Sequence, residues 1–155
     1  MTETTPTFDT PNYEQQIDIG RPPDSVFAAL TTAAGVSGWW TPSTGSGTVG
    51  GELHLTFPPG PMALRVDTAL PSSKVVWTVL NCDFEPDWVG TQIMFTLDPG
   101  AAACTTLQFC HEGLTAELPC YDQCRQGWSY YLASLREFVE TGVGRPGNRH
   151  GALRP

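Results

Sequence analysis

Positive charge is scarce in this sequence. Its 155 residues include 8 lysines and arginines against 16 aspartates and glutamates, which gives a formal charge of -8, and Lys74 is the single lysine. A phosphate backbone would be repelled by a chain with this balance. Nucleic acid is therefore not expected as a partner.

Long hydrophobic runs and a leader pattern are also missing. No apolar run approaches the roughly 18 residues that would span a bilayer, so no membrane span is expected. Residues 1–11 have neither the basic start nor the apolar centre of a secretory signal, and with two prolines they are predicted to form a disordered lead. Five cysteines are an odd number, and we expect reduced thiols in a cytoplasmic protein.

Motifs of common enzyme classes are absent: there is no G-x-S-x-G elbow, no P-loop, no H-E-x-x-H and no kinase set. The stretch Gly45–Gly50 does match G-x-G-x-x-G letter for letter. A dinucleotide site needs a helix after this motif, whereas residues 52–57 alternate like a strand. A flexible glycine turn is the favoured interpretation.

The carboxylates Asp83, Glu85 and Asp87 stand at alternate positions, as the first calcium ligands of an EF-hand loop do. Trp88 occupies the position where such a loop requires glycine. A solvated hairpin tip is therefore favoured, and its neighbours Phe84 and Trp88 are candidates to cap the mouth of a cavity.

Four residues near the C-terminal half could in principle hold zinc. Cys120 and Cys124 share one helix face, and Cys110 and His111 precede them in the sequence. None of the usual C-x-x-C spacings occurs, and reduced cysteines are common small core residues. Core packing is favoured, and no metal or cofactor is predicted.

The last long element has the clearest periodicity. From Cys120 to Thr141, large side chains recur at spacings of four, three, four and three residues: Cys124, Trp128, Tyr131, Leu135 and Phe138. This pattern predicts an amphipathic α-helix of roughly 33 Å.

The preceding sequence alternates instead between apolar and mixed positions. Predicted strands cover Tyr13–Ile19, Leu53–Phe57, Leu64–Val66, Val75–Val79, Ile93–Leu97 and Leu107–His111. Short turns make them antiparallel, and two short helices are expected after the first strand, the second over Ala33–Trp39. The predicted fold class is α+β, with a curved antiparallel sheet of six to seven strands gripping the long C-terminal helix. The predicted domain spans 12–142, followed by a flexible tail at 143–155.

This order of elements, together with several short motifs, resembles the START-like or SRPBCC superfamily, which has the helix-grip fold. The residues that carry the likeness are Val26–Thr31, Trp39-Trp40, Gly50-Gly51, His111-Glu112-Gly113, Gly127-Trp128, Leu132, Leu135 and Glu140-Thr141-Gly142. The sequence looks most similar to the branch of heat-shock-ATPase activator homologues. The resemblance implies an apolar cavity between the sheet and the long helix.

Strand alternation and the helical stripe select the side chains that would face such a cavity. The candidate ligand-binding residues are Trp39 and Trp40 near the mouth of the cavity, Leu55, Trp77, Phe95, Phe109 and His111 on the sheet, and Trp128 and Tyr131 on the helix. Some of these must be ordinary core. For His111, a hydrogen-bonded histidine near the strand end is the first interpretation, and a polar contact to a bound ligand is the second.

Three functional hypotheses follow. The first is a small-molecule-binding domain for an apolar, aromatic or lipid-like ligand. The second is a cyclase, aromatase or hydrolase-like enzyme acting on a polyketide-type substrate, with His111 or Tyr131 moving a proton. The third, implied by the resemblance alone, is a co-chaperone that activates a heat-shock ATPase. A homodimer formed through exposed sheet edges is also conceivable.

Overall fold

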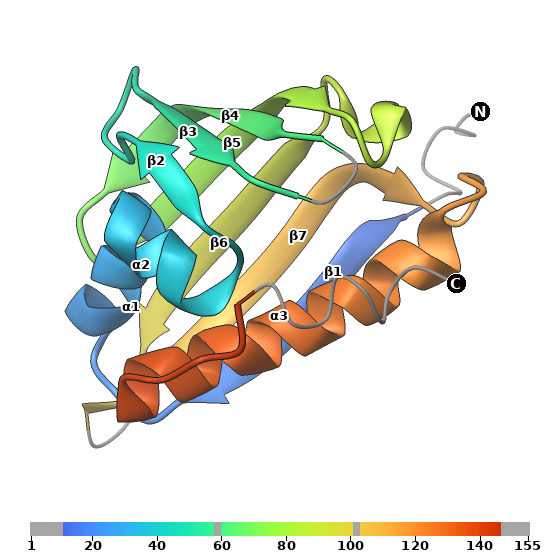
Figure 1. Cartoon of the computed structure of the whole chain (residues 1–155). Coiled ribbons are helices and arrows are strands. Elements are labelled where there is room, and N and C mark those ends of the chain that lie inside the picture. The colour runs from blue at the N-terminus through green and yellow to red at the C-terminus, as the bar shows by residue number, and fades with distance from the viewer. Residues whose placement is uncertain (1–10, 58–59, 101–102, 147–155) are drawn as a thin grey trace, which may run out of the picture.

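The computed structural model describes residues 11–57, 60–100 and 103–146. Within these ranges the chain forms a seven-stranded antiparallel sheet, three α-helices and one short 3-10 turn (Figure 1). The elements in chain order are β1 (Asn12–Ile19), α1 (Pro23–Thr31), α2 (Ala33–Trp39), β2 (Ser43–Gly45), β3 (Glu52–Leu55), β4 (Met62–Leu70), β5 (Lys74–Cys82), η2 (Pro86–Trp88), β6 (Gln92–Pro99), β7 (Thr105–Thr115) and α3 (Tyr121–Thr141). The predicted α+β class with a long C-terminal helix is confirmed.

The strand order is β1-β7-β6-β5-β4-β3-β2. Strands β2 to β7 therefore neighbour each other in sequence order, as short turns require, while β1 closes the far edge by pairing with β7, with Ile17 opposite Leu107. Strand β2 was not foreseen, because its glycine- and serine-rich sequence has no apolar alternation. It is held by pairing with β3, where Thr44 lies opposite His54.

The sheet curves around α3, which crosses its inner face diagonally (Figure 1). Helix α3 has 21 residues and ends at Gly142, whose φ of 87° is a left-handed conformation that glycine adopts without strain. At its start, the side chain of the N-cap residue Cys120 makes no capping hydrogen bond. In the part of the chain that the structure describes, no helix has the length and apolarity needed to cross a membrane.

Helices α1 and α2 cover one end of the curved sheet (Figure 1). Thr32 separates them, and its hydroxyl accepts a hydrogen bond of 2.9 Å from the N–H of Gly35. Helix α2 approaches α3 closely at Gly38, where an added Cβ would come within 2.3 Å of the Phe138 ring. This contact fixes the end of α2, and with it the position of Trp40.

Residues 143–146, the start of the predicted flexible tail, pack on α3. The N–H of Arg145 donates to the Ser134 hydroxyl at 2.7 Å, and its guanidinium pairs with Glu137 at 2.6 Å. The Ser134 hydroxyl also donates to the carbonyl of Trp39 at 2.8 Å, so this segment and the end of α2 meet on one buried side chain. Residues 147–155, and residues 1–10 of the predicted lead, lie outside the described residues.

Candidate functional site

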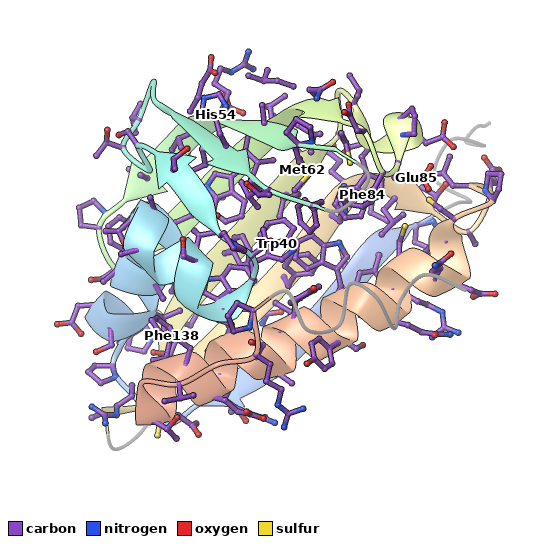
Figure 2. All side chains as sticks on the ribbon, in the orientation of Figure 1. Trp40, His54, Met62, Phe84, Glu85 and Phe138 are labelled. Carbon is purple, nitrogen blue, oxygen red and sulfur yellow. The ribbon has the colours of Figure 1, made fainter. Side chains whose placement is uncertain are left out.

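Aromatic side chains occupy the space between the inner face of the sheet and α3. Trp40, just after α2, lies at their centre (Figure 2), with its ring centroid 6.1 Å from that of Trp77 on β5 and 5.0 Å from that of Trp128 on α3. The nine predicted ligand-binding residues are at most 3 % exposed: Trp39, Trp40, Leu55, Trp77, Phe95, Phe109, His111, Trp128 and Tyr131. All nine therefore lie in the interior of the protein.

Trp39 lies deeper than its predicted place near a cavity mouth. Its side chain is 0 % exposed, and its indole N–H donates to the carbonyl of Ala29 at 3.0 Å. The ring stacks on Trp40 with centroids 5.4 Å apart and planes 18° apart. Trp39 therefore ties α2 to α1 and supports Trp40 from behind.

Trp77 has a polar atom without a partner. Its side chain is 0 % exposed, and its indole N–H makes no hydrogen bond to the described residues. The ring lies between Trp40, which stacks on it at an interplanar angle of 19°, and Phe95, which meets it edge-on at 5.1 Å. An unpaired buried donor costs about 1–3 kcal/mol, so this N–H marks the point in the layer where an acceptor would be most stabilising.

His111 on β7 is buried, and both of its ring nitrogens are engaged. Its Nδ1 accepts a hydrogen bond of 3.0 Å from the Trp128 indole, so its Nε2 carries the proton and donates to Thr91 Oγ1 at 2.8 Å. The Thr91 hydroxyl in turn donates a hydrogen bond to the carbonyl of Trp88 at 2.6 Å. Burial lowers the pKa of His111 from 6.5 to about 3. The residue is therefore hydrogen-bonded on both sides within the interior.

A row of aromatic rings leads from Trp40 toward the surface. Phe57 meets Trp40 at 6.1 Å and Phe84 at 4.7 Å, and Phe84, which is half-buried, meets Trp88 at 5.2 Å. Trp88 in turn stacks on Trp128 with planes 3° apart. Figure 2 shows Phe84 between Trp40 and Glu85, near the end of the molecule where α3 begins. Phe84 therefore lies at the outer end of this row, whereas Trp88 is buried at 5 % exposed.

Glu85, Cys120 and Cys124 form a second cluster beside this row. One potential ligand atom from each side chain lies within 4.8 Å of those of the other two. Burial raises the pKa values of all three groups, with a further rise from Asp87 for Glu85 and from Cys120 for Cys124. Of the four residues considered for zinc in the sequence, only Cys120 and Cys124 come together here, because the hydrogen bonds of His111 occupy both its nitrogens and Cys110 lines the opposite face of the sheet.

That opposite face carries a separate, more polar depression of about 390 Å³. Its lining includes Gln16, Met94, Gln108 and Cys110 from β1, β6 and β7. Because these residues alternate with the buried ones, the depression is separated from the aromatic layer by the sheet itself.

Two features of the interior were missed by sequence reasoning. The bond between Trp128 and His111 joins residues 17 positions apart, and the alternation and helical period place each of them inside without saying that they touch. Glu85 lies near Cys120 and Cys124, which are more than 30 residues later in the sequence. Its alternation with Asp83 and Asp87 had predicted a solvent-exposed position.

The family assignment rests on a sequence comparison that covers most of this fold. Residues 21–140, from the loop before α1 to the end of α3, match the model of the family described as activator of Hsp90 ATPase homolog 1-like protein. The chain belongs to this family. A comparison with curated protein sequences found no match.

Solved structures of similar proteins agree with the assignment. The Aha1 dimer from Colwellia psychrerythraea is 29% identical with a TM-score of 0.75, over 86% of this chain and 98% of that one. DynU16, a protein of the dynemicin biosynthetic locus, is 25% identical with a TM-score of 0.66, over 84% of this chain and 48% of that one. The present chain therefore covers about half the length of DynU16. CalU16 from Micromonospora echinospora is 18% identical with a TM-score of 0.66, over 83% of this chain and 76% of that one, and shares the fold.

Proposed function

We propose that this chain is a small-molecule-binding domain that takes an apolar aromatic ligand carrying a hydrogen-bond acceptor. The ligand would lie between the sheet and α3, in the aromatic layer around Trp40 and Trp77. The observation that carries the proposal is the N–H of Trp77, which has no hydrogen-bond partner among the described residues and lies in a fully buried, aromatic environment. Pockets for such ligands combine apolar walls with a few placed polar groups, and this N–H is one.

The chemistry of the layer selects the ligand class. Rings that meet at centroid distances of 5–6 Å around Trp40 offer stacking and edge contacts to another aromatic ring. The Trp77 indole donates but cannot accept, so it favours a ketone, an ether or a phenolate over an amine. The half-buried ring of Phe84, followed by Phe57, is the proposed route from the surface to Trp40.

The test compares two probes that differ in one acceptor. Binding of naphthalene and of acetylnaphthalene is measured by isothermal titration calorimetry on the purified protein. We expect acetylnaphthalene to bind about fivefold or more tightly, since one hydrogen bond contributes about 1 kcal/mol, and Trp77→Phe to remove that preference. Trp88→Phe, which deletes the other unpaired indole N–H, is the matched control and keeps the preference. Failure of the unmodified protein to bind either probe contradicts the proposal, as does a preference that survives Trp77→Phe.

A co-chaperone role is the second candidate, and the likeness to the Aha1 dimer over 98% of that chain supports it. In this role the domain would raise the ATPase rate of the heat-shock chaperone of its own host. The experiment adds the purified domain to that chaperone and measures ATP turnover, with heat-unfolded domain as the control. An unchanged rate at saturating domain would exclude this function.

A homodimer is proposed as the assembly. Among the described residues, β1 has a sheet neighbour on one side and none on the other, and it is eight residues long, compared with three residues for β2 at the other edge. The structure of the similar protein from Colwellia psychrerythraea is a dimer. Light scattering coupled to gel filtration measures the mass directly. A monomer at all accessible concentrations contradicts this assembly.

The enzyme alternative, a cyclase-like activity in which His111 moves a proton, has weaker support. Both nitrogens of His111 are in hydrogen bonds, and its pKa of about 3 leaves it neutral at physiological pH. A proton transfer would first have to break the bond to Trp128 or to Thr91. Turnover of a polyketide-type substrate that is lost in His111→Ala with the fold intact would restore this alternative.

A further inference from the structure

We propose that Glu85, Cys120 and Cys124 form a binding site for a thiophilic divalent cation, with zinc as the chemical type. The site lies beside the aromatic layer, where the connection between β5 and β6 meets the start of α3 (Figure 2, at Glu85). The proposal rests on three convergent side chains, on the charge around them and on the buried donor of Trp88.

The first argument is geometric. A carboxylate oxygen and two thiol sulfurs lie within 4.8 Å of one another. In a tetrahedral zinc site, bond lengths of about 2.3 Å to sulfur and 2.0–2.2 Å to oxygen place neighbouring ligand atoms roughly 3.5–3.8 Å apart. Small rotamer changes of three partly exposed side chains close this difference. The two sulfurs are four residues apart at the first turn of α3, so that helix presents both on one face.

The second argument is electrostatic. When ionised, the three groups would carry three negative charges in a half-buried position. The carboxylate of Asp87 adds a further negative charge that acts on both Glu85 and Cys120. Within the described residues, none of the main influences on the pKa values of these three groups comes from a basic side chain. A divalent cation would supply the missing compensation. Thiolates select zinc and similar ions over magnesium and calcium, which prefer oxygen ligands.

The third argument is the indole of Trp88. This side chain is 5 % exposed, and its Nε1 makes no hydrogen bond to the described residues. The N–H nevertheless faces Cys124 closely enough to lower the pKa of that thiol, against the larger rise from burial. A metal-bound thiolate is a far better acceptor than a thiol, so metal binding would turn this loose contact into a charge-assisted hydrogen bond.

Three protein ligands leave the fourth tetrahedral position to water or to a further ligand. The bound ion would also join α3 to the loop that carries Trp88. Because Cys120 is the N-cap residue of α3 and makes no side-chain capping bond, the ion would fix a helix end that the protein otherwise leaves uncapped.

Cobalt provides the direct test, because thiolate ligation of Co²⁺ gives intense charge-transfer absorption and a tetrahedral ligand field gives strong visible bands. Reduced, chelator-treated protein is titrated with Co²⁺ and then with Zn²⁺. We expect one equivalent of Co²⁺ with both signatures, displacement by Zn²⁺ and a rise in melting temperature with either ion. Cys124→Ser and Glu85→Gln should weaken or abolish binding, and Trp88→Phe should weaken it by about 10–100-fold.

Cys110→Ser is the matched control, since Cys110 lies on the other face of the sheet and its loss should leave the titration unchanged. Absence of charge-transfer absorption in the unmodified protein overturns the proposal, as does uptake that persists in a protein lacking both Cys120 and Cys124. Formation of a Cys120–Cys124 disulfide in air, combined with no cobalt uptake after reduction, also overturns it and identifies the pair as a redox couple.

Discussion

The indole of Trp128 on α3 donates its N–H to Nδ1 of His111 on β7 over 3.0 Å, and both side chains are at most 2 % exposed. This bond couples the long helix to the sheet at a specific pair of atoms. It also fixes which nitrogen of His111 carries the proton, and so places the histidine in a chain that runs on to Thr91.

The His111 link should make stability depend on pH. The unfolded chain takes up the imidazole proton near pH 6.5, whereas the folded protein resists it down to about pH 3. In this window the unfolded state binds more protons than the folded state. The contribution of His111 to the free energy of unfolding is therefore fully present above pH 6.5, and on the order of 4–5 kcal/mol is lost as the pH falls toward 3. Urea unfolding at a series of pH values measures it, and His111→Phe should show a shallower slope. Parallel slopes for the two proteins would refute this assignment.

Removing the donor of this bond should also destabilise the protein. Trp128→Phe keeps an aromatic ring but leaves Nδ1 of His111 buried without a partner, at a cost of about 1–3 kcal/mol in addition to the lost packing. The double variant Trp128→Phe with His111→Phe should lose less than the sum of the two single losses. Additive losses, measured by chemical denaturation, would mean that the bond contributes no coupling.

The contact between Gly38 and Phe138 predicts a reciprocal effect. A methyl group added at Gly38 would come within 2.3 Å of the Phe138 ring, so Gly38→Ala should cost about 1–3 kcal/mol by overpacking, measured by chemical denaturation. Figure 2 shows Phe138 on the part of α3 below α2. Phe138→Leu is the matched background, and there the alanine substitution should be nearly neutral because the smaller side chain leaves room for the methyl. A full penalty in the Phe138→Leu background would contradict the steric explanation.

On the outer face of the sheet, Asp67 accepts hydrogen bonds from Thr78 and Arg65. Although burial alone would raise its pKa, these partners hold the pKa below its ordinary value. Thr78→Val should raise the pKa of Asp67 and cost about 0.5–1.5 kcal/mol at neutral pH, with a smaller cost at pH values low enough to protonate the carboxyl. NMR titration of Asp67 reports the first effect. An unshifted carboxyl in the variant would show that Thr78 is not a determinant.

Local patterns predicted most of the fold because each element is amphipathic at its own period. Alternation placed His111 and Trp77 inward, and the helical stripe identified the face of α3 that carries Trp128. Strand β2 was not predicted, because a three-residue edge strand has too few positions to show a period. The Glu85–Cys120–Cys124 cluster was not predicted either, because it depends on the packing of the η2 turn against α3. No local sequence pattern indicates that contact.

The pairing of β1 with β7 has a consequence for how the protein is made. Strand β1 leaves the ribosome long before β7, its sheet neighbour among the described residues, since Ile19 pairs with Thr105. During synthesis β1 therefore remains unpaired until β7 has been made, whereas neighbouring strands from β2 to β7 can pair one after another. β1 and β7 are the paired strands farthest apart in the sequence, and closing so long a loop costs conformational entropy, so we expect this pairing to form late. Among the described strands, β1 thus has the longest interval before its partner is made, and so the longest exposure to mispairing.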